Sequence, residues 1–272
     1  MGKRIITAAL TGALTPVELN PNIPVTPKQI QEDCIRVRKE GAAMVHIHVR
    51  DEQAHGCMDP KIFKEVFQRI RDNTDLLINL TTSGGPTPTD ADRWAHVIEL
   101  KPDMCTYDCG TFNWLPGGPY MNSTEFLRQL GDVCIENGVK PEIEVFDIGQ
   151  IEASKFFLKE GHLKAPMHYD FVLGVKGAAP ATPEMVYTMR SLLPEGSTWS
   201  ATGIGAGHLP VMFTAITLGG SVRVGLEDNI YYRKGELATN AQLVARAARV
   251  IRDFGEEVAT PDEAKEILGL KK

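Results

Sequence analysis

The residues of this sequence best suited to chemistry are two histidines separated by one residue, His46 and His48. They lie in the stretch 42–51, where apolar side chains alternate with His46, His48 and Arg50. Side chains two residues apart on a strand point the same way, so the two Cα atoms would lie roughly 6.5–7 Å apart. Two imidazoles at this spacing can bind one ion, and zinc suits them. The alternative is a pair of hydrogen-bonded histidines at a strand end.

Glu227 is our predicted third metal ligand. It follows the strand candidate at 221–225, and Arg223, Gly225 and Glu227 share one face of that segment. In a closed barrel the second and the eighth strand both flank the first, so this carboxylate can reach the two histidines. A site of two histidines and one glutamate leaves positions open for substrate oxygens. The alternative is an ion pair between Glu227 and a nearby cation.

Arg223, Asp228 and Glu144 are the candidate catalytic residues. The fork of Arg223 suits a substrate carboxylate or a developing enolate, because guanidinium is a bidentate donor. An ion pair with Asp228 or Glu144 is the competing interpretation. Asp228 could serve as a general base, with its pKa set by its neighbours. A carboxylate that caps a loop is the alternative for Asp228.

Hydroxyl groups and glycines follow the third strand candidate and could hold a substrate carboxylate. The segment 81–85 reads Thr-Thr-Ser-Gly-Gly, and the next strand offers Thr106 and Asp108. His208 stands in a Gly-x-Gly-x-Gly-His turn that could face the same site, although this pattern lacks the lysine of a phosphate-binding loop. We expect the remaining histidines at the surface or at helix ends: His55, His96, His162 and His168.

Short apolar segments alternate with helical patterns along the chain, which is typical of a parallel α/β fold. We expect eight strands, at Arg4–Leu10, Ala43–Val49, Leu76–Thr81, Met104–Asp108, Glu142–Phe146, Phe171–Val175, Thr198–Thr202 and Ser221–Gly225. Helices are expected near 27–40, 60–72, 88–99, 123–137, 148–160, 183–192, 208–218 and 239–253. Eight such units predict a (β/α)8 TIM barrel, with the active site at the carboxyl ends of the strands. An open doubly wound sheet is the alternative, but its G-x-G-x-x-G turn is missing after the first strand.

Helix boundaries support one domain over residues 1–272. Thr26-Pro27-Lys28-Gln29 is a capping box with proline in the first turn, and Gly41 stands where a C-terminal cap would. Thr260 begins the same signal, which predicts a short C-terminal helix at 261–268. The sequence contains no linker or repeat that would divide it.

Composition narrows the range of partners. The net charge of -6 argues against nucleic acid. The five cysteines form no C-x-x-C pair, so neither a disulfide framework nor a cysteine zinc site is expected. No segment has the length of a membrane span. We expect a cytoplasmic protein without a membrane partner.

Seven segments resemble the β-keto acid cleavage enzymes, and they extend from the first strand to the last long helix. The H-x-H-x-R and R-x-G-x-E-D-N patterns together are highly specific for this family. The similar segments are Thr7–Ala13, Asn20–Pro27, His46–Asp51, Pro141–Glu144, Val172–Val175, Val222–Asn229 and Asn240–Val244.

This resemblance implies a zinc-dependent barrel, usually a homotetramer, that condenses a β-keto acid with acetyl-CoA to give acetoacetate and a new acyl-CoA. By the same resemblance His46, His48 and Glu227 would hold Zn²⁺. Asp228 and Arg223 would form the catalytic pair, with Glu144 as a further polar group. The residues that would position the substrate are Thr81, Ser83, Gly84 and Thr106.

Leu14 departs from the pattern of the family. Members that act on amino-bearing keto acids carry glutamate at this position, and leucine cannot bind a cationic group. We therefore expect a substrate with a neutral or apolar side chain, unless Glu18, four residues later, compensates.

Two other functions stay open. One is a metal-dependent barrel lyase that cleaves a CoA-linked hydroxy acid without acetyl-CoA. The other is a barrel that binds a metabolite without catalysis, against which the intact set of His46, His48, Arg223, Glu227 and Asp228 argues.

Overall fold

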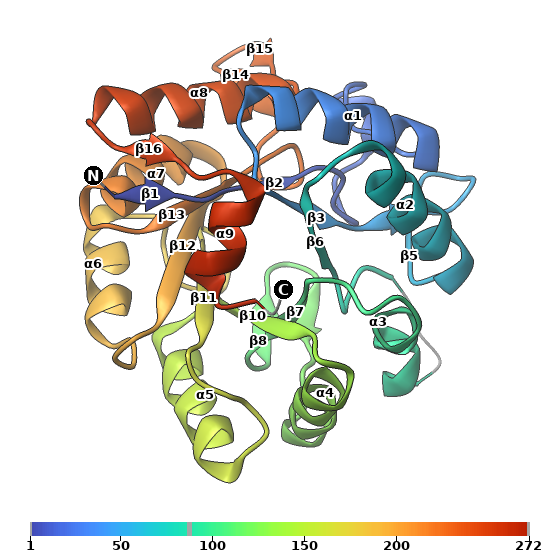
Figure 1. Ribbon diagram of the computed structural model, residues 1–272, viewed down its shortest axis with the longest axis vertical. Helices are drawn as coiled ribbons and strands as arrows, with labels where there is room; N and C mark the ends of the chain where they lie inside the picture. Colours follow the sequence, from blue (N-terminus) through green and yellow to red (C-terminus); the bar gives the residue numbers. More distant parts are fainter. Residues whose placement is uncertain (1, 86–88, 271–272) are drawn as a thin grey trace.

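A computed structural model describes residues 2–85 and 89–270 of the chain. Eight parallel strands close into one barrel, with the strand order β10-β11-β12-β13-β2-β3-β6-β7, and helices surround it (Figure 1). The predicted (β/α)8 barrel is confirmed. The barrel strands are β2 (Ile6–Ala9), β3 (Met44–Ile47), β6 (Leu77–Leu80), β7 (Met104–Asp108), β10 (Lys140–Val145), β11 (His168–Leu173), β12 (Thr198–Gly203) and β13 (Ser221–Val224).

The helices that follow the strands turn one apolar face toward the barrel and close its outside. They are α1 (Pro27–Glu40), α2 (Pro60–Asn73), α3 (Ala95–Leu100), α4 (Thr124–Asn137), α5 (Ile148–Glu160), α6 (Pro183–Ser191), α7 (His208–Thr217) and α8 (Asn240–Asp253). The helix expected at 88–99 is shorter than predicted. A 3₁₀ turn at Asp90–Arg93 precedes α3, and residue 88 lies outside the described residues.

The predicted helix signals are present. Thr26 accepts a hydrogen bond from the amide of Gln29, whose side chain caps Thr26 in return, and Gly41 ends α1 with φ 118°. Thr260 begins α9 (Pro261–Leu268) with the same capping box. This last helix lies across one open end of the barrel in Figure 1. There Leu268 and Ala264 pack in one cluster with residues of the first strands, so α9 closes the amino-terminal end.

Short two-stranded sheets extend the chain beyond the barrel strands. Three of them form from segments that follow β3, β7 and β13: β4 (Val49–Arg50) with β5 (Gly56–Cys57), β8 (Phe112–Trp114) with β9 (Gly118–Tyr120), and β14 (Tyr231–Arg233) with β15 (Glu236–Leu237). A fourth pairs β1 (Lys3–Arg4) with β16 (Glu257–Val258). The first three surround the carboxyl ends of the strands, where barrel active sites lie.

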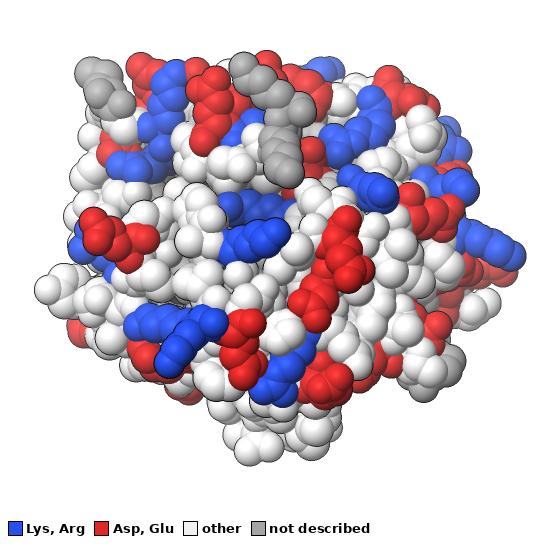
Figure 2. Space-filling view, turned by 60° about the horizontal axis from the view of Figure 1, so that its bottom comes forward, with Lys and Arg blue, Asp and Glu red and all other residues white. Residues whose placement is uncertain are grey.

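The surface carries charges of both signs. On the face in Figure 2, Lys and Arg side chains are interspersed with Asp and Glu. In the described part of the chain, no helix has both the length and the apolar character needed to cross a membrane.

Candidate active site

His46, His48 and Glu227 meet at the carboxyl end of the barrel. His46 lies on β3, and His48 follows where that strand ends. The Nε2 atoms of both histidines lie 3.4 Å from Oε1 of Glu227. Both histidines are buried. The predicted trio is therefore assembled in one place.

The trio fits a divalent ion. One ligand atom from each residue lies within 4.8 Å of the other two. Oε2 of Glu227 and Nδ1 of both histidines are buried with no hydrogen-bond partner among the described residues. Burial lowers the pKa of His46 to about 4, which keeps this imidazole neutral, as a metal ligand must be. Two neutral imidazoles and one carboxylate are the donor set of many catalytic zinc sites.

Two glycines allow this close approach. Gly225 ends β13 with φ 158°, and a Cβ there would lie 1.9 Å from the carbonyl oxygen of Ala9. The chain can thus cross β2 closely, and the amide of Glu227 donates to that same carbonyl at 3.2 Å. Gly84 has φ 149°, and a Cβ would lie 2.7 Å from Nδ1 of His48. Gly225 therefore lies against the backbone of β2, and Gly84 against the side chain of His48, at distances that only glycine allows.

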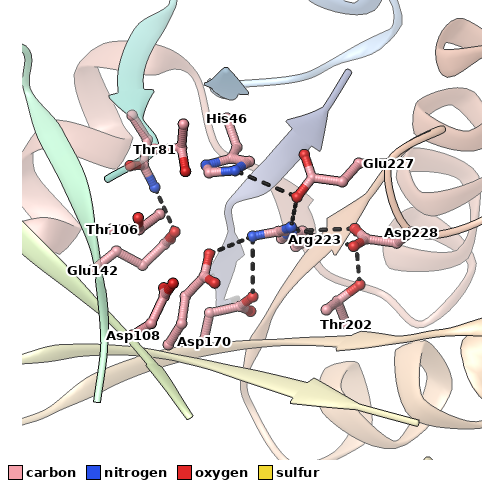
Figure 3. A network of polar contacts seen from close by, with 12 residues as sticks. His46, Thr81, Thr106, Asp108, Glu142, Asp170, Thr202, Arg223, Glu227 and Asp228 are labelled. Carbon is pink, nitrogen blue, oxygen red and sulfur yellow. Dashed lines mark hydrogen bonds and ion pairs between the residues drawn. The ribbon is translucent and has the colours of Figure 1, made fainter. Parts of the chain in front are cut away.

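Arg223 forms the centre of a buried ionic network (Figure 3). Nη1 lies 2.6 Å from Glu144 and Nη2 lies 2.6 Å from Glu227. Nε and Nη2 donate to the two oxygens of Asp228 at 3.1 and 3.2 Å. Asp170 lies 3.8 Å away. The alternative that we gave for Arg223, an ion pair with Asp228 or Glu144, is thus present with both partners.

Burial sets the protonation of these carboxyl groups. It raises the pKa of Glu144 well above its ordinary value, although the Arg223 guanidinium opposes the shift. Burial, with the nearby charge of Asp170, raises the pKa of Glu142 to about 8. Burial likewise raises the pKa of Asp228 to about 6, again opposed by Arg223. In the metal-free protein Asp228 is therefore ionised at neutral pH, whereas Glu142 is mostly protonated.

A cavity of about 700 Å³ opens above this network. The predicted residues Leu14, Thr81, Ser83 and Gly84 line it, together with the metal trio, Arg223, Asp228 and Glu144. Thr106 does not belong to this lining, because its hydroxyl bonds to the backbone of Thr82 at 3.0 Å. The outer wall is apolar and is formed by Trp114, Phe146, Val172, Val175 and Ile204.

Arg50 shares the face of the two histidines, but its side chain contacts the backbone of a neighbouring loop. Its guanidinium donates to the carbonyl oxygens of Thr11, Gly12 and Thr15 at 2.9–3.1 Å. These bonds fix the loop that carries Leu14. That side chain is 68% exposed at the edge of the cavity, whereas Glu18 is not among the lining residues.

Several polar residues of the site were absent from our list of candidates. Asp170 lies one residue before the predicted start of its strand, which begins at His168. Tyr120 belongs to a hairpin without a sequence signal and donates a hydrogen bond to Asp108. Extension of the predicted strand by one residue toward the amino terminus would have included Asp170.

The expectation of a place at the surface or at a helix end was wrong for His168. His96 lies at the start of α3, a helix end as expected, but it is fully buried and stacks on Phe63 with ring centroids 4.0 Å apart. His168 is buried inside the barrel and bonds to Thr198 at 2.8 Å. His208 contacts Arg246 at 3.2 Å and does not line the cavity.

Comparisons with known proteins identify the family and the fold that this chain resembles. The profile of the β-keto acid cleavage enzyme family matches residues 3–270. The 3-keto-5-aminohexanoate cleavage enzyme of Fusobacterium nucleatum is 42% identical over 100% of both chains. The 3-dehydrocarnitine:acetyl-CoA trimethylamine transferase of Rhizobium meliloti is 38% identical over 98% of this chain and 96% of its own. The ternary complex of ObcA with a C4-CoA adduct and oxalate has the same fold, with a TM-score of 0.81 at 20% identity, over 92% of this chain and 68% of that one.

Proposed function

Because this chain belongs to the β-keto acid cleavage enzyme family, we propose that it condenses a β-keto acid with acetyl-CoA, with a divalent ion, Zn²⁺, at His46, His48 and Glu227. The products are acetoacetate and a new acyl-CoA. The observation that carries this proposal is the convergence of the metal trio with Arg223 and Asp228 below one cavity.

A divalent ion bound there would act as a Lewis acid on the ketone of the keto acid. Asp228 is the base in this proposal, because it is ionised near neutral pH and lines the cavity. It removes a proton from C2 of the keto acid, and this carbon attacks the thioester carbonyl. The C–S bond of the thioester then breaks and releases the CoA thiolate. This thiolate attacks C3, the C2–C3 bond breaks to give the new acyl-CoA and the carbanion of acetoacetate, and Asp228 returns the proton to C2.

Arg223 and Glu144 support this base. The guanidinium holds both oxygens of Asp228, which orients the carboxylate and offsets its charge. Glu144 accepts a hydrogen bond from Arg223 at 2.6 Å and lines the cavity, so it holds the guanidinium from the other side. Ser83 and Gly84 are the proposed contacts of the substrate carboxylate, since both line the same wall.

The keto acid is proposed to carry a neutral or apolar side chain. Leu14 brings no charge to the cavity edge, and the outer wall around Trp114 and Phe146 is apolar. Relatives are named for amino-bearing and trimethylamine-bearing keto acids, but also for 3,5-dioxohexanoate and 3-oxoadipate, so the preference has to be argued from this chain's own residues. Leu14→Glu would favour the amino-bearing keto acid, and Leu14→Gln is the neutral control of similar size.

The test is mass spectrometry of acetoacetate and new acyl-CoA formed from a panel of β-keto acids with acetyl-CoA. Product from neutral keto acids, its loss in His46→Ala and one ion per chain by metal analysis would support the proposal. Cleavage of a hydroxyacyl-CoA without acetyl-CoA would favour the lyase instead. A clear preference of the unmodified protein for the amino-bearing substrate would refute the role of Leu14.

The assembly and location that the family suggests are also proposals. We propose a homotetramer in the cytoplasm, and light scattering at several protein concentrations measures the first. A mass of one chain at every concentration would contradict it.

A further inference from the structure

Nine buried side-chain atoms lack a hydrogen-bond partner among the described residues, and two of them are of interest here. They are Nδ1 of His46 and Oε1 of Glu142. Both residues are at most 1% exposed. A polar group buried in this way is unfavourable unless something satisfies it. With an ion at Nε2, a neutral imidazole carries its proton on Nδ1, and the positive charge of that ion favours the carboxylate form of Glu142. The two atoms are then complementary, a donor and an acceptor.

The barrel brings these two groups together. His46 on β3 is the register partner of Asn79 on β6, and Glu142 points inward from β10. A nitrogen of His46 and carboxylate oxygens of Glu142 and Glu144 lie within 4.8 Å of one another. Figure 3 shows His46 between Glu227 on one side and Glu142 on the other. Since Nε2 lies near Glu227, Nδ1 is the nitrogen left for the side of Glu142.

Glu142 is also held in place from its other side. The amide of Asn79 donates to Oε2 of Glu142, which leaves Oε1 as the free oxygen. His168 lies 3.7 Å from that oxygen through Nε2. The neighbouring carboxyl of Glu144 is already bonded to Arg223 at 2.6 Å. Glu142 is therefore the better acceptor for His46.

We propose that Glu142 is a positioning residue that accepts a hydrogen bond from Nδ1–H of His46, directly or through one water. This bond would fix the tautomer of His46 and its ring orientation, so that the lone pair of Nε2 faces the ion. Carboxylates behind metal-bound histidines act in this way in many zinc sites. The inference rests on the proposed metal centre.

Glu142→Gln tests the proposal through metal affinity. Because Asn79 donates to Oε2, the new amide must turn its oxygen toward Asn79 and its NH₂ toward Nδ1–H of His46. Two donors then face each other, and we expect the affinity for Zn²⁺ to fall by about 10–100-fold. The measurement is competition with a chromophoric chelator on the full chain.

A double variant and a control sharpen this test. In the double variant Asn79→Asp with Glu142→Gln, the carboxylate at position 79 accepts a hydrogen bond from the NH₂ group at position 142. The amide oxygen at position 142 then faces Nδ1–H of His46. We expect affinity within about threefold of the unmodified protein, as for two changes that compensate each other. Asp33→Asn changes another buried carboxyl, which bonds to Asn240 and Arg36 outside the site, and should also stay within about threefold.

The outcomes separate the inference from the proposed function. If the unmodified protein binds no divalent ion, the metal centre itself is refuted. If it binds Zn²⁺ and Glu142→Gln binds equally well, the positioning role is refuted. Lower thermal stability of the metal-free variant with unchanged affinity would mean a purely structural role and would also overturn it. A changed visible spectrum of the Co²⁺-loaded variant, restored in the double variant, would support it.

Discussion

Replacement of Arg223 by methionine tests the electrostatics of the barrel interior directly. The guanidinium is 4% exposed and contacts Glu144, Glu227 and Asp228 at 2.6–3.2 Å. Methionine fills much of the same volume but leaves these carboxyl groups without their cation. Removal of one partner of a buried ion pair costs about 3–5 kcal/mol. For a chain of this size that corresponds to a fall in melting temperature of about 5–15 °C.

The loss should depend on pH with a defined sign. Arg223 opposes the pKa rise that burial causes in Glu144 and Asp228, so both folded-state pKa values rise further without it. Above the unfolded-state pKa the variant's native state then binds protons that the unfolded state has released. Its stability therefore falls as pH rises, by about 1.4 kcal/mol per pH unit for each extra proton. We expect the smallest deficit near pH 5 and a larger one near pH 8.

Urea unfolding of the chelator-treated protein, followed by circular dichroism, measures this deficit. Arg93→Met is the matched control, since Arg93 is also buried but donates to the carbonyl oxygens of Thr82 and Met121 and to the side chain of Asn122. These partners are neutral at both pH values. Replacement of Arg93 should give a deficit that is nearly the same at both pH values. An equally pH-independent deficit for Arg223→Met would refute the reasoning.

Three further predictions concern stability. The metal-free protein should lose stability as pH rises from about 7 to 8.5, because burial raises the pKa of Glu142 to about 8, above its unfolded value, while the buried histidines are by then neutral in both states; constant stability in denaturant titrations over this range would contradict this. Asn240→Ala should cost about 2–4 kcal/mol, because its buried amide bonds to Leu10, Leu226 and Asp33; a loss below about 1 kcal/mol would disprove it. Thr26→Ala should cost about 1 kcal/mol through the cap of α1, and Thr26→Ser much less; equal losses would show that the cap bond is unimportant.

Much of the barrel and of the metal trio could be predicted from the sequence. His46 and His48 alternate with apolar neighbours, and this pattern alone predicts that both side chains point to the same face of a strand, whatever the fold. Glu227 follows from topology, because β2 lies between β3 and β13 in the closed barrel. Parallel strands end at one side of a barrel, so residues distant in sequence meet there.

Other features depend on packing that a single sequence does not encode locally. Tyr120 donates a hydrogen bond to Asp108 from the hairpin β8–β9. Aromatic contacts of Tyr120 with Phe112 in the same hairpin and with Phe146 hold its ring in this position. His168 is polar at a strand start, which is typical of a surface residue, yet the register with Glu142 places it inside the barrel. Thr106 was chosen for its strand end, but its bond to Thr82 turns the hydroxyl away from the cavity.

The balance of charge in the barrel gives an independent reason to expect a cation at the trio. Six carboxyl groups, each at most 15% exposed, gather around one guanidinium: Asp108, Glu142, Glu144, Asp170, Glu227 and Asp228. Full ionisation would leave five uncompensated negative charges in a poorly hydrated space, which proteins avoid by proton uptake or by binding cations. The raised pKa values of Glu142 and Glu144 show that protons offset part of this charge. A divalent ion would offset two more charges, and at His46, His48 and Glu227 it would lie where the remaining unpaired ligand atoms converge.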